Sequence, residues 1–349
     1  MLNVVVASDD NYASLLLISV TSLLENNSDF ECINVYVLDD NLSQYNKNRI
    51  NNLKNTYSCN IFFIKIKQLD SLDINLFALE KDLTGTSLTT YARLFMPSLL
   101  PKDIDKLLYL DCDSLIVGSF KELWQMDISE YYCAAVLGTM NNNILKLYGF
   151  DEEDSYINAG FLLVNLKKWR EDNVEEKFLE FLANNQGRFF YHDQGVINDV
   201  FKHKIKIIEP KYNLQYFFQY YDYDLARKYR GIDTDYYTKE IVDESRENPI
   251  FLHFCGHEYE RPWNNQYHKY SRLFKEYAEK AGCDDVICYI ESPSLKAKLF
   301  YKATDNNLLK FILKLIPKKL VKNIIDKGST ENYRKYSLKA RESLNENDK

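Results

Sequence analysis

Two aspartates, Asp111 and Asp113, stand one position apart where an apolar run ends, in the stretch LLYLDCDSLIVGSF of residues 107–120. In an extended strand, side chains two positions apart point to the same side, so two like charges would lie close together. A cation between them would relieve this repulsion, and Mg²⁺ and Mn²⁺ prefer oxygen ligands. The pair therefore predicts a divalent-cation site at a strand end. For an isolated pair, a solvated turn would be the simpler interpretation.

The elements expected around this pair alternate between strands and helices. Such β-α-β order favours a mostly parallel sheet covered by helices, an α/β fold of the Rossmann-like type. The predicted strands are residues 2–7, 32–38, 60–66 and 106–110, and the predicted helices are 12–26, 43–56 and 89–99. Residues 1–115 are therefore expected to form a nucleotide-binding half.

Acidic residues close three of these strands. In open α/β sheets, ligands bind outside the carboxyl ends of the strands. Three acidic strand ends on one edge favour a binding site more than a single pair would. They are Asp9 with Asp10, Asp39 with Asp40, and Asp111 with Asp113.

Beyond residue 133 the pattern is less regular. A strand that enters a helix is predicted at 158–169, a helix at 193–201 and a strand at 204–209. Residues 211–237 hold eight tyrosines and two phenylalanines without a clear period. These rings could offer stacking faces to a ligand or form a buried aromatic layer, and the sequence leaves both open.

The composition describes a soluble globular protein of 349 residues with a net charge of −7. No apolar run approaches the ~18 residues of a membrane span, and the first residues do not resemble a secretory signal. Seven scattered cysteines without a CxxC pair indicate reduced thiols in a cytoplasmic protein. The GxGxxG, GxxxxGKS/T and HExxH motifs are absent, so dinucleotide, P-loop and zincin sites are not expected.

The charge is unevenly distributed along the chain. Residues 296–327 carry a net charge of +7, whereas residues 1–295 carry −15, so no nucleic-acid partner is expected. Lysines separate the apolar residues of 296–325 in an amphipathic pattern broken at Pro317. A basic helical extension over 281–328 is therefore predicted to dock on the cytoplasmic face of the inner membrane. Packing on the acidic body is the alternative. Residues 329–349 are expected to be disordered.

Six segments resemble, in the same order, the motifs of glycosyltransferase family 8, which contains bacterial lipopolysaccharide galactosyl- and glucosyltransferases and the glycogenins. The resemblance covers residues 2–275. It implies a GT-A fold over residues 1–280, divided at 115, a UDP-sugar donor, Mn²⁺ or Mg²⁺ as cofactor, and transfer with retention of anomeric configuration. The segments are VVVASDDNYA (4–13), TTYARLFMP (89–97), LLYLDCDSLI (107–116), INAGFLLVNLKKWR (157–170), HDQGVIN (192–198) and HFCG with RPW (253–263).

The same resemblance implies roles for individual residues. The metal ligands would be Asp111, Asp113 and His253, although a histidine in the apolar stretch FLHF would by itself indicate a core residue. Asp9 or Asn11 could also cap the helix that begins near Tyr12. The implied donor-binding residues are Ala7, Asp9, Asn11, Tyr12, Arg93, Asp111, Cys112, Asn158, Asp193, Gly256 and Arg261.

The implied catalytic residues are Arg93, Asp193 and Gln194. A buried arginine needs an anionic partner, so Arg93 would face the donor or else form a structural pair with Asp111 or Asp9. Gln194 stands where the family places its candidate nucleophile, but an amide is a poor nucleophile. We favour same-face attack, in which the departing UDP accepts the acceptor's proton, Gln194 stabilises the oxocarbenium-like charge and Asp193 binds sugar hydroxyls.

Two segments depart from the family pattern. The loop GHEYERPW at 256–263 is two residues longer than usual and carries Arg261 in place of lysine, which can still contact a phosphate. Gly138 and Thr139 stand where relatives often have an acidic residue that contacts the acceptor.

The predicted function is transfer of a hexose, galactose or glucose, from a UDP-sugar to a glycan or lipid-linked acceptor. Lipopolysaccharide, capsule or another surface glycan would be the product. A dehalogenase-type phosphatase also places DxD after a strand, but its later serine, threonine and lysine signals are not found. A non-catalytic sugar-nucleotide-binding or scaffold protein is the other alternative, marked by loss of a metal ligand or of Gln194. All of these residues are present.

Overall fold

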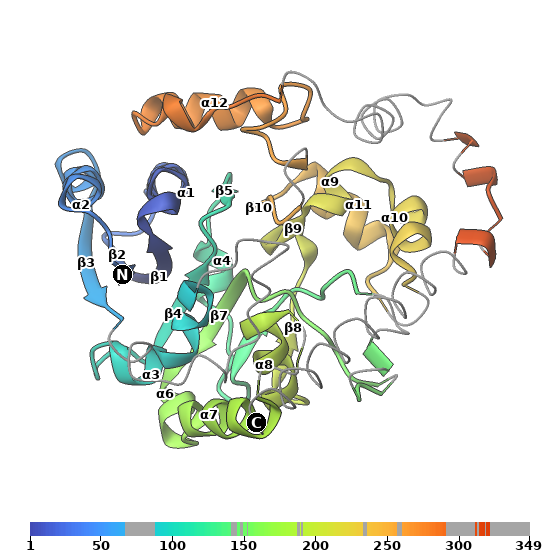
Figure 1. Cartoon of the computed structure of the whole chain (residues 1–349), viewed down its shortest axis with the longest axis horizontal. Coiled ribbons are helices and arrows are strands. Elements are labelled where there is room, and N and C mark those ends of the chain that lie inside the picture. The colour runs from blue at the N-terminus through green and yellow to red at the C-terminus, as the bar shows by residue number, and fades with distance from the viewer. Residues whose placement is uncertain are drawn as a thin grey trace, which may run out of the picture.

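The computed structural model describes residues 1–66, 88–140, 145–146, 149–151, 153–186, 189, 191–232, 236–256, 260–290, 311–312, 314–317 and 319–321. Strands and helices alternate through the first part of the chain, as predicted (Figure 1). The strands are β1 Leu2–Asp9, β2 Ile33–Asp40, β3 Cys59–Lys65, β4 Lys106–Leu110, β5 Ser114–Ile116, β6 Cys133–Ala135, β7 Phe161–Asn165, β8 Ile205–Ile207, β9 Leu214–Gln215 and β10 Phe251–His253.

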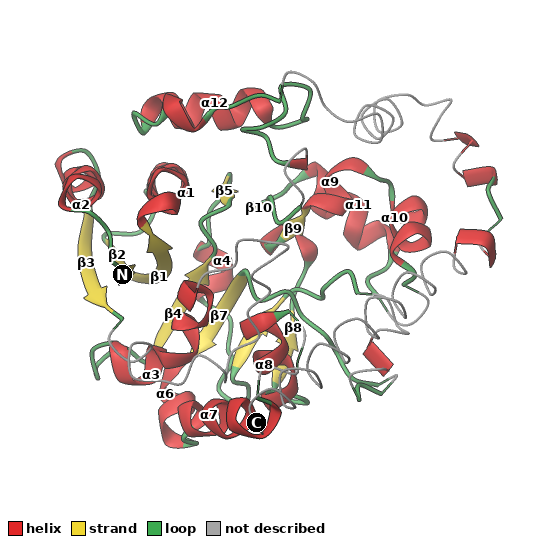
Figure 2. Ribbon diagram, viewed as in Figure 1, coloured by secondary structure: helices red, strands yellow, loops and turns green. Residues whose placement is uncertain are grey.

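Helices lie on both sides of the strands (Figure 2). The α-helices are α1 Ala13–Asn26, α2 Gln44–Asn51, α3 Met96–Leu99, α4 Lys121–Trp124, α6 Leu166–Glu171, α7 Val174–Asn185, α8 His192–Val200, α9 Tyr216–Tyr220, α10 Tyr223–Arg230, α11 Lys239–Glu247 and α12 Ser271–Lys280. The 3-10 helices are η1 Asp10–Tyr12, η2 Asn52–Asn55, η5 Leu88–Phe95, η6 Pro210–Tyr212 and η8 Asp284–Val286.

The main sheet has seven strands among the described residues, in the order β3-β2-β1-β4-β7-β6-β8. β1 pairs in parallel with β2 and β4, and β7 is antiparallel to both of its neighbours. Asp9 at the end of β1 lies opposite Asp40 at the end of β2. The prediction of a mostly parallel sheet flanked by helices is therefore confirmed, and its acidic strand ends do share one edge.

Both faces of this sheet are buried, because successive residues of each strand enter different cores. In β1, Val4 and Val6 face the core formed with α1 and α12, whereas Val5 faces the core formed with η5, α7 and α8. β4 divides in the same way between Leu108 and Tyr109. The near-continuous apolar strands of the sequence follow from this two-sided burial.

The single helix predicted over 89–99 is a 3-10 helix, η5, followed by one α-helical turn, α3. Contacts with other parts of the chain hold its first turn. The Thr89 hydroxyl bonds Asp40, and the Thr90 hydroxyl donates to Asp193 Oδ1 at 2.5 Å. These bonds join η5 to the carboxyl edge of the sheet, and Arg93 faces the same edge.

A second sheet of three strands, in the order β5-β10-β9, lies beside this edge. β10 is antiparallel to β5 and parallel to β9. Because the chain passes from β4 directly into β5, the second sheet starts at the quoted aspartates. His253 on β10 lies opposite Ser114 on β5, which fixes the histidine beside them.

Part of the predicted basic extension over 281–328 is described. Lys314 Nζ lies 2.7 Å from Asp222 Oδ2, and Lys228 Nζ donates to the Lys314 carbonyl at 3.1 Å. The tail therefore contacts α10, as the alternative of packing on the acidic body predicts. Most of the amphipathic segment, and all of 329–349, lies outside the described residues. The helices that are described are too short or too polar to cross a bilayer.

Candidate functional site

The quoted aspartates lie where the chain leaves the main sheet. β4 is buried up to Leu110, and the Asp111 amide donates to the Gly160 carbonyl at 2.9 Å. The backbone then bends at residues 112–113 before β5 begins, so it does not stay extended between the two carboxylates. The Ser114 hydroxyl donates to the Asp111 carbonyl at 2.7 Å and closes this bend.

His253 brings a third ligand atom to the bend. The Phe254 amide donates to the Asp113 carbonyl at 2.9 Å, which ties the end of β10 to the aspartates. His253 Nε2 lies 3.3 Å from Asp113 Oδ1 and 3.7 Å from Asp111 Oδ2. One ligand atom from each of the three residues lies within 4.8 Å of the others. The predicted metal ligands are thus brought together.

These three side chains fit a divalent cation. His253 Nε2 is buried and has no hydrogen-bond partner among the described residues, while Nδ1 lies 3.0 Å from Asn213 Oδ1. A Cβ at Gly160 would lie 2.2 Å from His253 Cε1 and 2.7 Å from Asp111 Oδ2, so only glycine leaves this space open. Two carboxylates and an imidazole nitrogen are donors that suit Mn²⁺.

Charge on the surrounding residues keeps Asp113 ionised. Burial alone would raise the pKa of Asp113, but His253 and Arg261 lower it below the usual value. For His253, burial alone would lower the pKa, yet Cys255 and Asp113 raise it well above the usual value. Positive charge is therefore already favoured at this point of the protein.

Arg93 joins four segments around the site. Its guanidinium lies 2.8 Å from Asp111 Oδ1 through Nη2, 2.9 Å from Asp193 Oδ2 through Nε, and donates to the Ala159 carbonyl at 2.7 Å. It also stacks over the Tyr109 ring, at 4.2 Å from the centroid. The pair with Asp111 that the sequence left open is present, and Asp193 takes the place expected for Asp9.

Gln194 and Asn158 form one amide network. Asn158 Nδ2 donates to Gln194 Oε1 at 3.2 Å, and the Ala159 amide donates to the same oxygen at 3.1 Å. Gln194 Nε2 donates to the Tyr156 hydroxyl at 3.3 Å. Because two donors already approach Gln194 Oε1, its lone pairs are engaged.

A cavity of about 370 Å³ opens between these groups. It lies at the carboxyl edge of the sheet, where ligands of such folds bind. Residues from both halves of the chain line it, and eight of them were predicted from the sequence. These eight are Arg93, Asp111, Asp113, Asn158, Asp193, Gln194, His253 and Arg261.

The other six predicted residues do not line this cavity. Asp9 Oδ1 accepts from the Tyr12 amide at 3.1 Å, so the capping role is present. The Cys112 thiol donates to the Ala7 carbonyl at 3.2 Å, and Arg261 Nε donates to the Gly256 carbonyl at 3.2 Å. Asn11 donates to Asp9 Oδ2 at 3.5 Å. Their roles in donor binding remain predictions.

Besides the Asp9 cap, three more of the six acidic residues at the strand ends support the fold. Asp10 Oδ1 accepts from the Ser43 amide and from Asn46, each at 2.8 Å, which holds the start of α2 and lowers the pKa of Asp10. Asp39 pairs with Lys47, and Asp40 accepts from Thr89. The acidic edge thus combines structural carboxylates with those of the site.

Several residues of the site were not predicted. Gly160 stands inside a quoted segment, but its role depends on the approach of His253, which sequence spacing does not show. Asn213, Gln215 and Tyr216 come from the stretch without a clear period. Further unpredicted lining residues are Thr90, Met140, Tyr191, His192, Cys255 and Arg230.

The tyrosine-rich stretch mostly forms the aromatic layer that was one of its two interpretations. Phe217, Phe218, Tyr220 and Tyr221 are buried, and Phe217 packs at an angle against Tyr221 with ring centroids 4.9 Å apart. Tyr216 is the exception among the described tyrosines of this stretch, because it lines the cavity. The rings therefore mostly form a packed aromatic layer rather than a series of stacking faces for a sugar.

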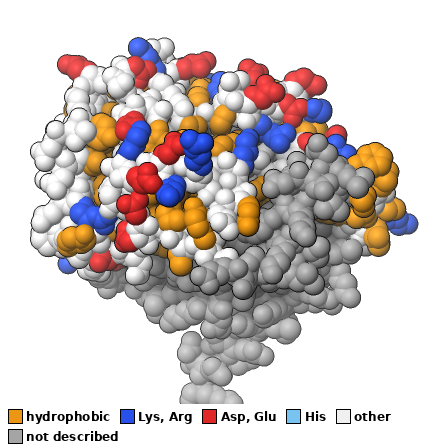
Figure 3. Space-filling model, turned by 90° about the horizontal axis from the view of Figure 1, so that it is seen from above, with side chains coloured by type: hydrophobic (Ala, Val, Ile, Leu, Met, Phe, Trp, Pro, Cys, Tyr) orange, Lys and Arg blue, Asp and Glu red, His pale blue; other side chains and the backbone are white. Residues whose placement is uncertain are grey.

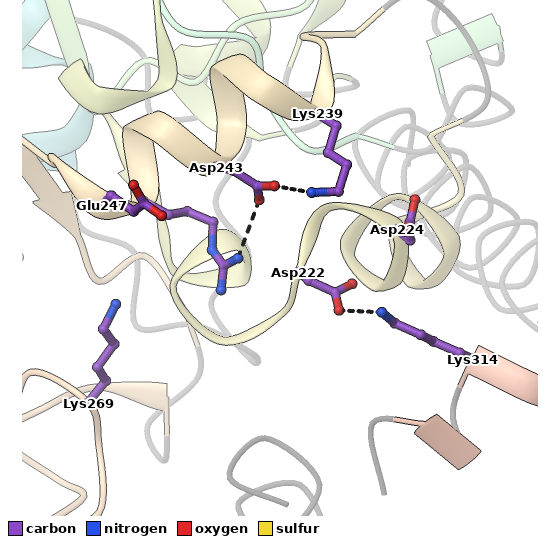
Figure 4. Close-up of a pocket in the computed structure, with 8 residues that line it drawn as sticks. Asp222, Asp224, Lys239, Asp243, Glu247, Lys269 and Lys314 are labelled. Carbon is purple, nitrogen blue, oxygen red and sulfur yellow. Dashed lines mark hydrogen bonds and ion pairs between the residues drawn. The ribbon is translucent and has the colours of Figure 1, made fainter. Parts of the chain in front are cut away.

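A second cavity, of about 460 Å³, lies between α10, α11 and the tail (Figure 4). Lys314 pairs there with Asp222, and Asp243 pairs with Arg246 at 3.6 Å and with Lys239. Its four acidic and four basic lining residues balance in charge, and none of them was predicted as a site residue. The first cavity is therefore the candidate active site.

The mostly parallel sheet flanked by helices, with the site at its carboxyl edge, agrees with the GT-A fold that the sequence predicts. The chain belongs to glycosyltransferase family 8, since residues 3–266 match the sequence profile of Glycosyl transferase family 8. A Haemophilus influenzae protein whose name assigns it to the glycosyltransferases is 37% identical over 231 residues, 65% of this chain and 66% of that protein.

Two further relatives have more specific names. The Escherichia coli lipopolysaccharide 1,2-glucosyltransferase is 27% identical over 262 residues, 74% of this chain and 71% of that protein. The crystal structure of the galactosyltransferase LgtC with donor and acceptor sugar analogs has a TM-score of 0.66 and 26% identity, covering 86% of this chain and 100% of that one. The predicted family and fold are thereby confirmed.

Proposed function

We propose that the protein is a retaining hexosyltransferase that moves galactose or glucose from a UDP-sugar to a glycan acceptor. The proposal depends on one observation: a single cavity is lined by Asp111, Asp113 and His253 together with Arg93 and Gln194. A phosphatase or a bare turn would not require a buried imidazole nitrogen to face the two aspartates. Similarity to a glucosyltransferase and to a galactosyltransferase supports both donor sugars.

Asp111, Asp113 and His253 would hold Mn²⁺, with Mg²⁺ as the alternative ion. When bound, the cation supplies positive charge that stabilises the diphosphate of the leaving UDP. Arg261 adds a fixed cation at the same wall of the cavity, so it is suited to bind a phosphate oxygen. Tyr12 and Asp9, at the end of β1, would hold the nucleoside.

The contacts of Gln194 favour same-face attack over a covalent intermediate. Gln194 Oε1 accepts from Asn158 and Ala159, which supports a positioning and charge-stabilising role over a nucleophilic one. Asp193 is neutralised by Arg93, so it is suited to accept hydrogen bonds from sugar hydroxyls. The acceptor hydroxyl would pass its proton to the departing phosphate as the new glycosidic bond forms.

The acceptor is proposed to belong to a lipopolysaccharide, capsule or other surface glycan, which includes lipid-linked acceptors. Four hydrophobic side chains of the tail are 45–64% exposed: Phe311, Ile312, Leu315 and Leu320. Figure 3 shows hydrophobic side chains gathered at one edge of the molecule. With the lysines around them, they support docking on an anionic membrane at the cytoplasmic face.

The proposal is tested by UDP release from a panel of UDP-sugars, with Mn²⁺ and with EDTA. Slow hydrolysis of UDP-galactose or UDP-glucose is expected for the wild type with Mn²⁺ and not with EDTA. Asp113→Ala should lose it, whereas Asp285→Ala, which alters an exposed aspartate, should not. If the wild type shows neither UDP release nor Mn²⁺-dependent UDP binding, that result would favour the non-catalytic scaffold instead.

A further inference from the structure

Asn213 lies between the candidate metal ligands and the amide network of Gln194. It follows η6 at the start of β9 and is 1% exposed. Its Oδ1 lies 3.0 Å from His253 Nδ1, and its Nδ2 donates to Asn158 Oδ1 at 2.8 Å. One side chain thus contacts both a candidate metal ligand, His253, and the amide network, through Asn158.

Backbone groups fix the orientation of every amide in this chain of contacts. The Gly160 amide donates to Asn158 Oδ1 at 3.1 Å, so Nδ2 of Asn158 must face Gln194. The Ala159 amide donates to Gln194 Oε1, which directs Gln194 Nε2 toward Tyr156. A flipped Asn158 would place its oxygen against Gln194 Oε1, and a flipped Gln194 would place its NH2 group against the donors of Asn158 and Ala159. Either flip would leave a backbone N–H unpaired.

The same polarity fixes the histidine. Since Asn158 Oδ1 accepts from Asn213 Nδ2, Asn213 must present its oxygen to His253. His253 Nδ1 therefore carries a hydrogen, so Nε2 is the nitrogen whose lone pair would bind a cation held by Asp111 and Asp113. Metal-binding histidines depend on such a partner for their tautomer and ring orientation.

We infer that Asn213 is a positioning residue that sets the metal-binding tautomer of His253 and links it to the Asn158–Gln194 amides, which the backbone has already oriented. The inference rests on the proposed function, because it presumes a cation at Asp111, Asp113 and His253. It adds that the two halves of the site are aligned by one buried amide. Removing that amide therefore affects cation affinity through the lost contact with His253, and turnover through the lost contact with Asn158.

Two substitutions distinguish the effects of these two contacts. Asn213→Ala removes both contacts. Asn213→Asp keeps an oxygen for His253 Nδ1 but places a second oxygen against Asn158 Oδ1. Asn213→Ala should therefore weaken Mn²⁺ binding by about 10- to 100-fold, the usual effect of losing a partner behind a metal ligand. Asn213→Asp should bind Mn²⁺ at least as tightly as the wild type, yet lose turnover as Asn158→Ala does.

Mn²⁺ binding is measured on the full chain by electron paramagnetic resonance without donor, and kcat and KM by UDP release. Asn27→Ala is the matched control, because Asn27 is also fully buried and also bonds on both sides, to the Leu23 carbonyl and the Phe120 amide. It should lower thermal stability without changing Mn²⁺ affinity.

The outcomes distinguish this inference from the proposed function. If the wild type binds Mn²⁺ and folded Asn213→Ala binds it equally tightly, the inference about Asn213 is overturned and the proposed function is not. Equal loss of Mn²⁺ affinity in Asn213→Asp and Asn213→Ala would overturn the tautomer argument. A wild type that does not bind Mn²⁺ would overturn both proposals together.

Discussion

Asp111 divides its two carboxylate oxygens between Arg93 and His253. Oδ1 lies 2.8 Å from Arg93 Nη2, whereas Oδ2 lies 3.7 Å from His253 Nε2. Asp111 is thus a counter-ion of a buried arginine and a ligand candidate at once. Asp113, in contrast, forms its described ion pair only with His253. The two aspartates of one short motif therefore differ in what they contribute.

We expect Asp111→Asn and Asp113→Asn to lose Mn²⁺ binding alike but to differ in stability. Asp111→Asn leaves Arg93 with Asp193 alone, and breaking a buried ion pair costs up to about 3–5 kcal/mol. Denaturant unfolding of both variants and the wild type in EDTA checks this. Equal free energies of unfolding for the two variants would contradict the division of roles.

Gly160→Ala should weaken cation binding without unfolding the protein. Its Cβ would approach His253 Cε1 and Asp111 Oδ2 far inside contact distance, so it displaces the ligands or fills their space. Mn²⁺ affinity should fall on the order of 10-fold or more. Gly138→Ala is the control, because its Cβ would make only ordinary contacts of 3.4 Å or longer. Unchanged Mn²⁺ affinity in Gly160→Ala would mean that the cation binds elsewhere.

Stability should fall below about pH 6.5 because of His268. Burial among aromatic rings lowers the pKa of His268 to about 3, so the folded state resists protonation that the unfolded chain accepts. Between these pH values the unfolded state binds more protons, and unfolding becomes easier by up to about 1.4 kcal/mol per pH unit.

Urea unfolding of the wild type and His268→Gln between pH 7.5 and 5 measures this slope. His268→Gln should show the flatter dependence, because its amide does not titrate. His203→Gln is the control, since the His203 side chain is 76% exposed. Identical slopes for the wild type and His268→Gln would exclude His268 as the cause.

The tail should bind anionic vesicles through its exposed hydrophobic residues. The double change Phe311→Ser and Leu315→Ser removes two large side chains, each worth about 1.5–3 kcal/mol when fully buried. Cosedimentation with phosphatidylglycerol vesicles should therefore weaken on the order of 10-fold or more. Tyr45→Ser, at a tyrosine that is 70% exposed on α2, should have no effect. Equal binding by all variants would favour packing on the protein as the tail's only role.

Features with a regular period or a contiguous motif could be predicted from the sequence. The strands of the first third, the pair Asp111 and Asp113, and the family all carry such signals. The partnership of Arg93 with Asp193 could not be predicted, because the two residues are far apart in the chain and only the fold joins η5 to α8. Asn213 lies in a stretch without a period, and its importance comes from two hydrogen bonds that no spacing encodes.

Arg93 also affects how the pocket is assembled during folding. One guanidinium contacts the ends of β4 and α8 and the carbonyl before β7, while its own backbone belongs to η5. Displacing any one of these segments would remove a partner of this buried charge, so we expect the segments around the pocket to unfold together. On heating, the loss of activity and the global unfolding of the protein should then follow the same temperature curve.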